Sequence, residues 1–297
     1  MSTRALEVVA TGALALVEDL GRPGHGASGV GRSGAADRSA LRLANRLVAN
    51  PEDAAGIEAV FGGLAVRASS DNRLPLTVAL SGAPAPADVD GAPVGHHALV
   101  TVRPGQVLRL GTPPTGLRTY LAVRGGIAVE PVLGSRSTDV LAGLGPPKLE
   151  PGQVLPVGPE PAELPLVDVA PVAVPPGGAV TLRAIMGPRA DRLADPAALA
   201  RTVWTASSRS DRVGMRLEGA QLERVGSGEL PTEGMVRGAI QVPPGGEPVL
   251  FLADHPVTGG YPVGAVVIDA DVDRAAQVRP GQTVRFVIVP PPWQDEN

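Results

Sequence analysis

The segment "VRPGQVLRLG", residues 102–111, joins a proline–glycine pair to a run in which apolar and polar residues alternate. The same pattern returns in "LEPGQVLPVG", residues 149–158, and in "VRPGQTVRFVIV", residues 278–289. Proline followed by glycine suits the two central positions of a type II turn, because proline fixes φ and glycine accepts a positive φ. Each copy therefore predicts a turn that leads into a β-strand. Three copies are compatible with ordinary hairpin turns and equally with a duplicated barrel.

The composition extends this pattern to the whole chain. Its 297 residues include 38 glycines and 32 prolines, which separate many short apolar runs. Aromatic residues make up only 2%, so the core must consist mainly of Val, Leu, Ile and Ala. Short apolar runs between Pro/Gly turns favour barrels or sandwiches over a parallel βαβ sheet. We expect a mainly β protein with a few short helices, and strands at residues 74–80, 98–102, 107–110, 119–123, 179–185, 236–242, 249–252, 265–268 and 283–289.

One segment carries a clear helical signal. Leu41, Ala44, Leu47 and Val48 recur at helical spacing after Asp37, which suits an N-cap. The pair "NP" at residues 50–51 should end this helix. Further short helices are expected at residues 52–59 and 196–201.

The proline-rich residues 159–178 contain few helical signals and form the expected linker. We therefore predict an N-terminal lobe at residues 1–160, which carries the helical insertion, and a C-terminal lobe at residues 175–297.

Charge and residue types exclude several classes of function. A net charge of −4 and the scarcity of aromatic residues disfavour nucleic-acid binding. The absence of cysteine excludes disulfides, thiolate metal sites and a cysteine nucleophile. The four histidines do not show the spacing of a metal site, so none is expected. No apolar stretch approaches the roughly 20 residues of a membrane span, and we expect a cytoplasmic protein.

The loop before the predicted helix contains "GVGRSG", residues 29–34, which matches the dinucleotide-binding pattern G-x-G-x-x-G. That site requires a buried strand ending at the first glycine. Here "GRPGHGAS" precedes the motif, which indicates a loop and argues against a dinucleotide site.

The same loop remains a candidate anion site. Glycines let backbone N–H groups converge, and the N-terminus of the helix after Asp37 adds partial positive charge. Arg22 and His25 lie close by in sequence, so a carboxylate, carbonate or phosphate group could bind there. The alternative is a purely structural loop in which Asp37 only caps the helix.

Two further segments combine arginines with acidic residues. In residues 123–139, Arg136 lies within "GSRSTD", which suits a small polar ligand or a loop held by a pair with Asp139. In residues 207–219, Arg212 and Arg216 could clamp an anion if they share a face, or could pair with neighbouring acids. The sequence leaves both alternatives open.

The last motif spans residues 238–262, "GAIQVPPGGEPVLFLADHPVTGGYP". It places Gln241, Asp254, Thr258 and Tyr261 around two glycine turns. Asp254 directly follows an apolar run and should lie at the end of a strand, where sites commonly form. We favour a functional role for this segment.

Taken together and in order, these four segments resemble the signature segments of the family formed by the C subunits of bacterial 5-oxoprolinases. Its members are also described as allophanate hydrolase subunit 2 or as biotin-dependent carboxyltransferase domains. The resemblance extends over nearly the whole chain. It departs from the family's usual pattern at Glu18, at residues 146–148 and at Thr232.

The resemblance implies two cyclophilin-like β-barrel lobes. It also implies a protein that joins the B-type and A-type subunits of 5-oxoprolinase to hydrolyse 5-oxo-L-proline to L-glutamate with ATP. Lys148 is the only lysine and no phosphate-binding P-loop is present. ATP must then be held by arginines and backbone N–H groups, in part by a partner subunit.

Two alternatives follow from the same resemblance. The chain could be the carboxyltransferase component of a biotin-dependent urea or amide carboxylase, with biotin on a separate carrier. It could also be a non-catalytic KipA-like regulator that sequesters a kinase inhibitor. Under the leading hypothesis we expect Asp254 and Tyr261 to be catalytic, and the other candidates to bind substrate or an anion: Arg22, His25, Asp37, Arg136, Arg212, Arg216, Gln241 and Thr258. We further expect residues 22–37 to face a common site with residues 254–261.

Overall fold

A computed structural model describes residues 4–71, 73–226 and 230–291. The chain divides into two compact units that are discontinuous in sequence. Unit 1 contains the described residues up to Arg22, then Ser33–Asp139 and Gly143–Pro175. Unit 2 contains Pro23–Arg32, Val140–Ala142 and the described residues from Pro176 onward. The predicted lobe boundaries at residues 160 and 175 stay a prediction, and they did not include the two short segments that join unit 2.

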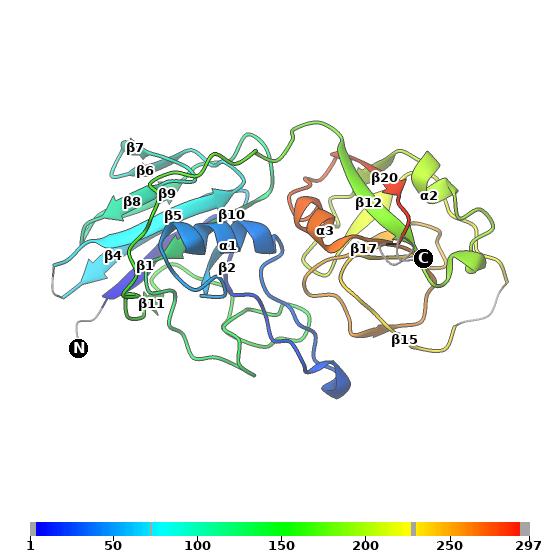
Figure 1. The fold of residues 1–297 in the computed structure, drawn as a ribbon, viewed down its shortest axis with the longest axis horizontal. Coiled ribbons are helices and arrows are strands. Elements are labelled where there is room, and N and C mark those ends of the chain that lie inside the picture. Colours follow the sequence, from blue (N-terminus) through cyan, green and yellow to red (C-terminus); the bar gives the residue numbers. More distant parts are fainter. Residues whose placement is uncertain (1–3, 72, 227–229, 292–297) are drawn as a thin grey trace. The chain divides into compact units, whose positions relative to one another are not determined.

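Unit 1 is built from two antiparallel sheets, which Figure 1 shows with their helix. One sheet has six strands in the order β11 (Val154–Pro156), β1 (Arg4–Thr11), β4 (Leu64–Ser70), β9 (Val107–Leu110), β6 (Ala87–Val89) and β7 (Ala92–Val94). The other has five strands in the order β2 (Leu14–Glu18), β3 (Gly56–Val60), β10 (Arg118–Val123), β5 (Leu76–Gly82) and β8 (Leu99–Val102).

A single apolar core joins the two sheets of unit 1. Leu6 and Val66 of the six-stranded sheet pack in one cluster with Leu80 and Leu121 of the five-stranded sheet. The helix α1 (Arg38–Leu47) covers the other face of the five-stranded sheet, along β10 and β5 (Figure 1). All six residues of β10 are therefore buried. β10 is also the middle strand of its five-stranded sheet.

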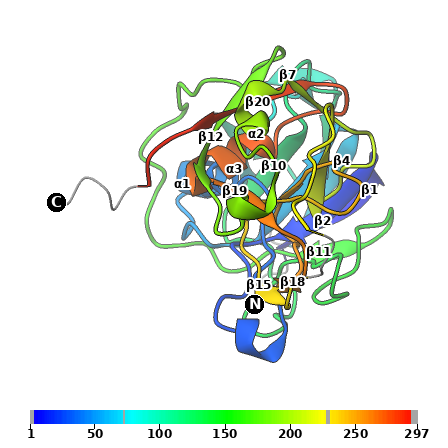
Figure 2. The same ribbon diagram turned by 90° about the vertical axis from the view of Figure 1, so that its right-hand side faces the viewer.

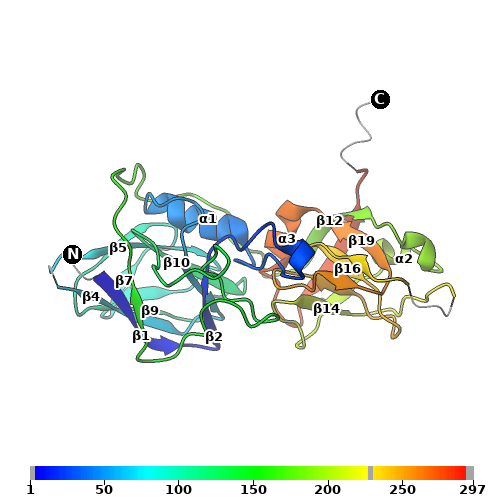
Figure 3. The same cartoon turned by 90° about the horizontal axis from the view of Figure 1, so that it is seen from below.

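Unit 2 is a closed barrel, seen from its side in Figure 2 and from below in Figure 3. Its strand order is β12 (Val180–Met186), β19 (Val263–Val267), β16 (Ala239–Gln241), β17 (Val249–Phe251), β14 (Gly214–Glu218), β13 (Trp204–Ala206) and β20 (Thr283–Ile288). The parallel pairing of β12 with β20 closes the ring. Unit 2 also contains two short helices, α2 (Ala198–Arg201) and α3 (Asp269–Ala275). Outside the barrel, β15 (Glu233–Gly234) pairs with β18 (Thr258–Gly259).

The three Pro-Gly-Gln segments adopt one turn. In the first, Gly105 has φ of 87°, the N–H of Gln106 donates to the carbonyl of Arg103 at 3.0 Å, and the N–H of Arg103 donates to Oε1 of Gln106 at 2.9 Å. The glycines of the other two copies have φ of 88° and 81°, and both glutamines repeat this pair of hydrogen bonds. The turns lead into β9, β11 and β20 as the sequence predicts.

The predicted strands and two of the predicted helices are confirmed, within a few residues at their ends. The carboxylate of Asp37 accepts the N–H of Ala40 at 2.9 Å, which begins α1 as the capping pattern indicates. The helix predicted at residues 52–59 is wrong, because Gly56–Val60 forms β3 between β2 and β10. Pairing on both sides outweighs the helical propensity of this segment.

The helix α3 was not predicted, because no side chain caps its N-terminus. It is held instead by residues distant in sequence: Arg237 binds Asp269 and Asp273, each at 2.6 Å, and Arg183 binds Asp271.

A mainly β protein is confirmed, and unit 2 forms a closed barrel as expected, whereas the strands of unit 1 form two separate sheets. Loops replace the missing strand pairs at the outer edge of β2. There, Leu149 donates its N–H to Ala15 and Thr138 donates its N–H to Val17, each at 3.0 Å. No helix among the described residues has the length and apolar character needed to cross a membrane.

A pair of histidines lies in the loop between β7 and β8. The rings of His96 and His97 meet edge to face with centroids 4.4 Å apart. Burial, and secondarily the charge of His97, lower the pKa of His96 from 6.5 to about 4. Burial also lowers the pKa of His97.

We expect the His96→Leu variant to lose less stability than the wild type as the pH falls from 7 to 4.5. The unfolded chain protonates His96 near pH 6.5, but the folded chain does so only near pH 4. The stability contributed by neutral His96 is therefore fully present above pH 6.5 and is lost as the pH falls toward 4. The difference in the free energy of unfolding, measured with denaturant, should be on the order of 2 kcal/mol after allowance for partial exposure. Parallel pH dependences of the two proteins would contradict this assignment.

Candidate functional site

Two short segments of the N-terminal half of the sequence belong to unit 2. Pro23–Arg32 contains most of the glycine-rich motif, and Val140–Ala142 directly follows the motif around Arg136. Unit 2 therefore contains most of the first motif, all of the third and fourth motifs, and the segment that directly follows the second.

Asp254 connects several of these segments. Its carboxylate binds Arg212 in a two-point pair, with Nε to Oδ2 at 2.9 Å and Nη2 to Oδ1 at 3.1 Å. The N–H of Val140 donates to the same Oδ2 at 3.1 Å. Arg212 and Asp254 are both buried. This carboxylate thus fixes the third and fourth motifs to the segment that follows the second.

The glycine-rich segment approaches the residue next to Asp254. A Cβ atom added to Gly31 would lie 3.4 Å from the carbonyl oxygen of His255. The ring of His255 stacks on Phe251 with centroids 6.0 Å apart, and its Nδ1 lies 2.8 Å from the carbonyl oxygen of Pro256. Within unit 2, Gly31 therefore lies beside His255 of the segment 254–261, and the common site expected for the two segments stays a prediction.

Gln241 and Tyr261 are also in contact. The side-chain amide of Gln241 donates to the carbonyl of Tyr261 at 3.2 Å. Tyr261 is 38% exposed, and the guanidinium carbon of Arg224 lies 5.8 Å from its ring centroid. Tyr261 therefore has a fixed backbone and a ring that reaches solvent.

The two ends of the glycine-rich segment are held in unit 1 by Asp19. Its carboxylate accepts the N–H of Gly21 at 2.7 Å, the N–H of Arg136 at 2.6 Å, and the hydroxyls of Ser135 and Ser137 at 2.6 and 2.5 Å. The carbonyl of Asp19 accepts the N–H of Ala35 at 2.9 Å. One buried residue thus joins the first motif to the second and brings the two ends of the segment together.

Glu58 provides a second buried carboxylate, which holds the residues that follow the glycine-rich segment. Its Oε2 accepts the hydroxyl of Tyr120 at 2.7 Å and the N–H of Ala36 at 3.0 Å. Tyr120 in turn accepts the N–H of Asp37 at 2.8 Å, and Nε of Arg118 lies 3.3 Å from Oε1 of Glu58. Burial, followed by the charges of Glu58 and Asp37, raises the pKa of Tyr120 well above its usual value. The neutral phenol therefore serves as a hydrogen-bond relay.

Arg22 is buried in unit 1 rather than open to a ligand. Its Nη2 donates to the carbonyl of Ser137, its Nε lies 3.4 Å from the carbonyl oxygen of Val132, and its Nη1 lies 3.7 Å from Oδ2 of Asp139. Arg136 is partly buried and donates through Nε to Val129 at 2.7 Å. The partner expected for Arg136, Asp139, instead lies next to Arg22.

The remaining predicted residues differ in exposure. His25 is partly exposed and precedes the short 3₁₀ turn Gly26–Ser28. Arg216, on β14, and Thr258, on β18, are exposed. Because Arg212 is buried with Asp254 while Arg216 reaches solvent, the structure does not combine these two arginines into one buried clamp.

These arginines do not fit a triphosphate site as they stand. Arg22 and Arg212 are already bound to carbonyl or carboxylate oxygens, and a phosphate at Arg212 would have to displace Asp254. No group of three or more His, Cys, Asp or Glu side chains that could hold a metal was found among the described residues.

Sequence analysis missed Asp19, Glu58 and Tyr120 as organising residues. A signal was present for Asp19, since it precedes the glycine-rich loop and a Ser-rich loop follows later in the chain. Glu58 was hidden because its segment was assigned to a helix.

We expect removal of either partner of the Arg212–Asp254 pair to destabilise the protein by about 3–5 kcal/mol, because the remaining charge stays buried. The Asp254→Asn and Arg212→Met variants should each show this loss in denaturant unfolding, and the double variant should lose clearly less than the sum. A cycle on the exposed pair Arg209–Glu247, 3.2 Å apart, is the control and should give a coupling below about 1 kcal/mol. Simple additivity at residues 212 and 254 would contradict a buried pair.

Gly34→Ala and Gly24→Ala form a matched pair of substitutions. Both glycines have left-handed φ, 93° and 91°, so each alanine meets similar backbone strain. A Cβ on Gly34 would lie 2.6 Å from the backbone nitrogen of Gly21, whereas one on Gly24 meets nothing within 4 Å. Gly34→Ala should therefore lower the melting temperature more, by the equivalent of at least about 1 kcal/mol. Equal losses would show that the close approach of Gly21 and Gly34 contributes nothing.

Comparisons with known proteins match this arrangement over nearly the whole chain. The family described as "Carboxyltransferase domain, subdomain A and B" matches residues 28–288. The 5-oxoprolinase C subunit of Escherichia coli (strain K12) is 37% identical over 287 residues, which cover 95% of this chain and 90% of that protein. The protein of the same name from Haemophilus influenzae is 34% identical over 280 residues, covering 93% and 88%. The resemblance to the C subunits of 5-oxoprolinases is thereby confirmed.

Solved structures share the fold. TTHA0988 superposes with a TM-score of 0.85 at 34% identity, over 95% of this chain and 55% of that chain. The Kluyveromyces lactis urea carboxylase superposes with a TM-score of 0.89 at 28% identity, over 96% of this chain and 27% of that chain. The chain thus spans nearly all of the two 5-oxoprolinase relatives but only about half, or about a quarter, of these longer polypeptides. The chain belongs to the carboxyltransferase-domain family and carries its subdomains A and B.

Proposed function

We propose that this chain is the C-type subunit of an ATP-dependent 5-oxoprolinase, which hydrolyses 5-oxo-L-proline to L-glutamate together with B-type and A-type partner subunits. The observation that carries the proposal is the match to two proteins of that name along about nine tenths of their length.

The chemistry of the reaction explains why a shared site is needed. A lactam carbonyl is a poor electrophile, and phosphoryl transfer to its oxygen would activate it for attack by water. Water adds to the activated carbon, and the ring C–N bond breaks so that the ring nitrogen becomes the amino group of glutamate. A second water then hydrolyses the resulting acyl phosphate, and the phosphoryl group leaves as inorganic phosphate. Such a site must stabilise developing negative charge with fixed donors. Because the buried arginines of this chain are already bound, we assign the nucleotide mainly to a partner subunit.

Within unit 2 we assign separate roles to the candidate residues. Asp254 acts as a positioning residue through Arg212 and Val140, since its carboxylate is buried and hydrogen-bonded. Tyr261 and Thr258 are exposed residues, and we assign their hydroxyl groups to contact with the substrate.

The test is reconstitution from purified proteins. The isolated chain should release no glutamate from 5-oxoproline and ATP, and the mixture with the B-type and A-type subunits of the same genome should release it steadily. Steady release by the chain alone, or none by an assembled complex, would overturn the proposal.

Tyr261→Phe tests the site within that complex. The substitution removes only the hydroxyl and keeps the ring near Arg224, so the melting temperature should not change. If the hydroxyl contacts the reacting substrate, kcat should fall by about 10²-fold or more. Full activity would leave Tyr261 with a structural role only.

A second candidate function is the carboxyltransferase step of a biotin-dependent carboxylase, which the likeness to K. lactis urea carboxylase favours. It predicts consumption of ATP that depends on bicarbonate, a biotin carrier and urea, with no dependence on 5-oxoproline. Assay of both substrate sets on the same complex separates the two functions.

A further inference from the structure

We propose that residues 161–175, here called the strap, form with the groove beneath them the docking surface for a partner subunit of the proposed complex. The strap belongs to unit 1. Among the described residues, six of the sixteen large exposed apolar side chains lie in its eleven residues from Leu164 to Val174: Leu164, Leu166, Val167, Val169, Val172 and Val174. Exposed apolar side chains gathered in one short segment are a feature of interaction sites on soluble proteins.

Hydrogen bonds fix the backbone of the strap at two points, so its exposed apolar side chains lie on a segment that is held in place. At its start, Arg124 donates to the carbonyls of Pro161, at 2.6 Å, and Glu163, and also to Val48 at 2.9 Å. Further along, Leu99 donates its N–H to the carbonyl of Asp168 at 2.9 Å, and the N–H of Ala170 donates to His97 at 2.8 Å.

Between these anchors two leucines are exposed to solvent. Leu164 is 74% exposed and Leu166 is 97% exposed. Because the backbone of the strap is already held, a partner that covers these leucines has to order only their side chains.

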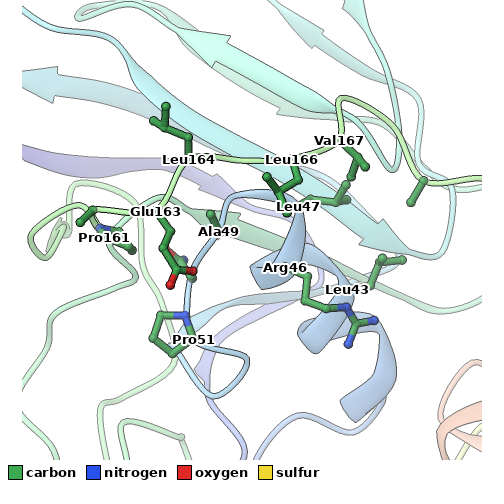
Figure 4. A pocket seen from close by; sticks show the side chains of 13 residues that line it. Leu43, Arg46, Leu47, Ala49, Pro51, Pro161, Glu163, Leu164, Leu166 and Val167 are labelled. Carbon is green, nitrogen blue, oxygen red and sulfur yellow. The ribbon is translucent and has the colours of Figure 1, made fainter.

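A groove of about 800 Å³ lies between the strap and the C-terminal half of α1. Figure 4 shows Leu164, Leu166 and Val167 on the strap, with Leu43 and Leu47 on the helix opposite. Its lining is mainly hydrocarbon. A few aliphatic or aromatic side chains of a partner would fit such a volume, which is how the best-packed residues of protein interfaces bind.

The charges of the strap define the partner further. Its only charged residues are Glu163 and Asp168, both exposed, and it contains no lysine or arginine. An anionic lipid surface would be repelled, whereas a protein surface with an apolar centre and a basic rim would be complementary.

The occupant we assign is a partner subunit, so the inference rests on the proposed function. The two relatives that this chain matches nearly end to end are named as subunits. In TTHA0988, the matched part is only 55% of the chain, so the same polypeptide carries a large additional part. Such a partner must cover an apolar surface on this protein, and the strap is where such side chains concentrate.

The natural absence of cysteine permits a direct test. Leu166→Cys introduces a single exposed thiol, and Val154→Cys, at a position 60% exposed on β11, is the matched control. The rate of maleimide labelling of each variant is measured by mass spectrometry, alone and with the B-type and A-type subunits of the same genome. Labelling at residue 166 should slow by at least about tenfold in the complex, while labelling at residue 154 should not change, because thiol reactivity follows access.

A second pair of variants tests affinity. Leu164→Ser with Leu166→Ser removes the outward leucines without filling or emptying the core, and it should weaken complex formation at least about tenfold in size-exclusion or calorimetric titration. Val154→Ser should leave the affinity unchanged.

Each outcome has one reading. A complex that forms without protecting residue 166 overturns the docking surface and leaves the proposed function standing. Protection within a complex that releases no glutamate from 5-oxoproline supports the surface and overturns the proposed function. Concentration-dependent protection by the chain alone would assign the surface to a second copy, and absence of any complex with the wild type would overturn the assigned occupant.

Discussion

The buried pair of Arg212 and Asp254 is the interaction on which unit 2's candidate site depends. Two hydrogen bonds hold the guanidinium, and a third reaches the backbone of Val140 from the N-terminal half of the sequence. A buried carboxylate is stable only when charge and hydrogen bonds compensate the loss of water. Arg212 and Val140 therefore explain why Asp254 can be buried, and Asp254 explains why Val140 belongs to unit 2.

In unit 1, buried carboxylates likewise hold the backbone around the glycine-rich segment. The Asp19 carboxylate accepts the N–H of Gly21, before the glycine-rich segment, and the N–H of Arg136 in the second motif. The Glu58 carboxylate accepts the N–H of Ala36, just after the segment. Both carboxylates act mainly on backbone N–H groups and hydroxyls, so they determine where loops lie rather than what they bind. In unit 2, by contrast, Tyr261 is exposed to solvent.

Sequence patterns correctly predicted the features that depend on interactions between residues close in sequence. The Pro-Gly-Gln turns and the Asp37 cap depend on neighbours in sequence, and both were predicted correctly. Residues 52–59 carry helical propensity, but β3 lies between two partner strands, and α3 is held by distant arginines. The same limit applies to the candidate site. Its motifs were visible in the sequence. The contacts of Asp254 with Arg212, and those of Asp19 and Glu58, join residues far apart in the chain, and no sequence spacing reveals them.

In unit 2, the Asp254 carboxylate holds the segment at Val140. Hydrogen exchange of the Val140 amide measures this directly, because its N–H donates to that carboxylate. We expect slow exchange of the Val140 amide in the wild type and exchange at least about tenfold faster in Asp254→Asn, under conditions where both proteins remain folded. Equal exchange rates at Val140 in the two proteins would contradict it.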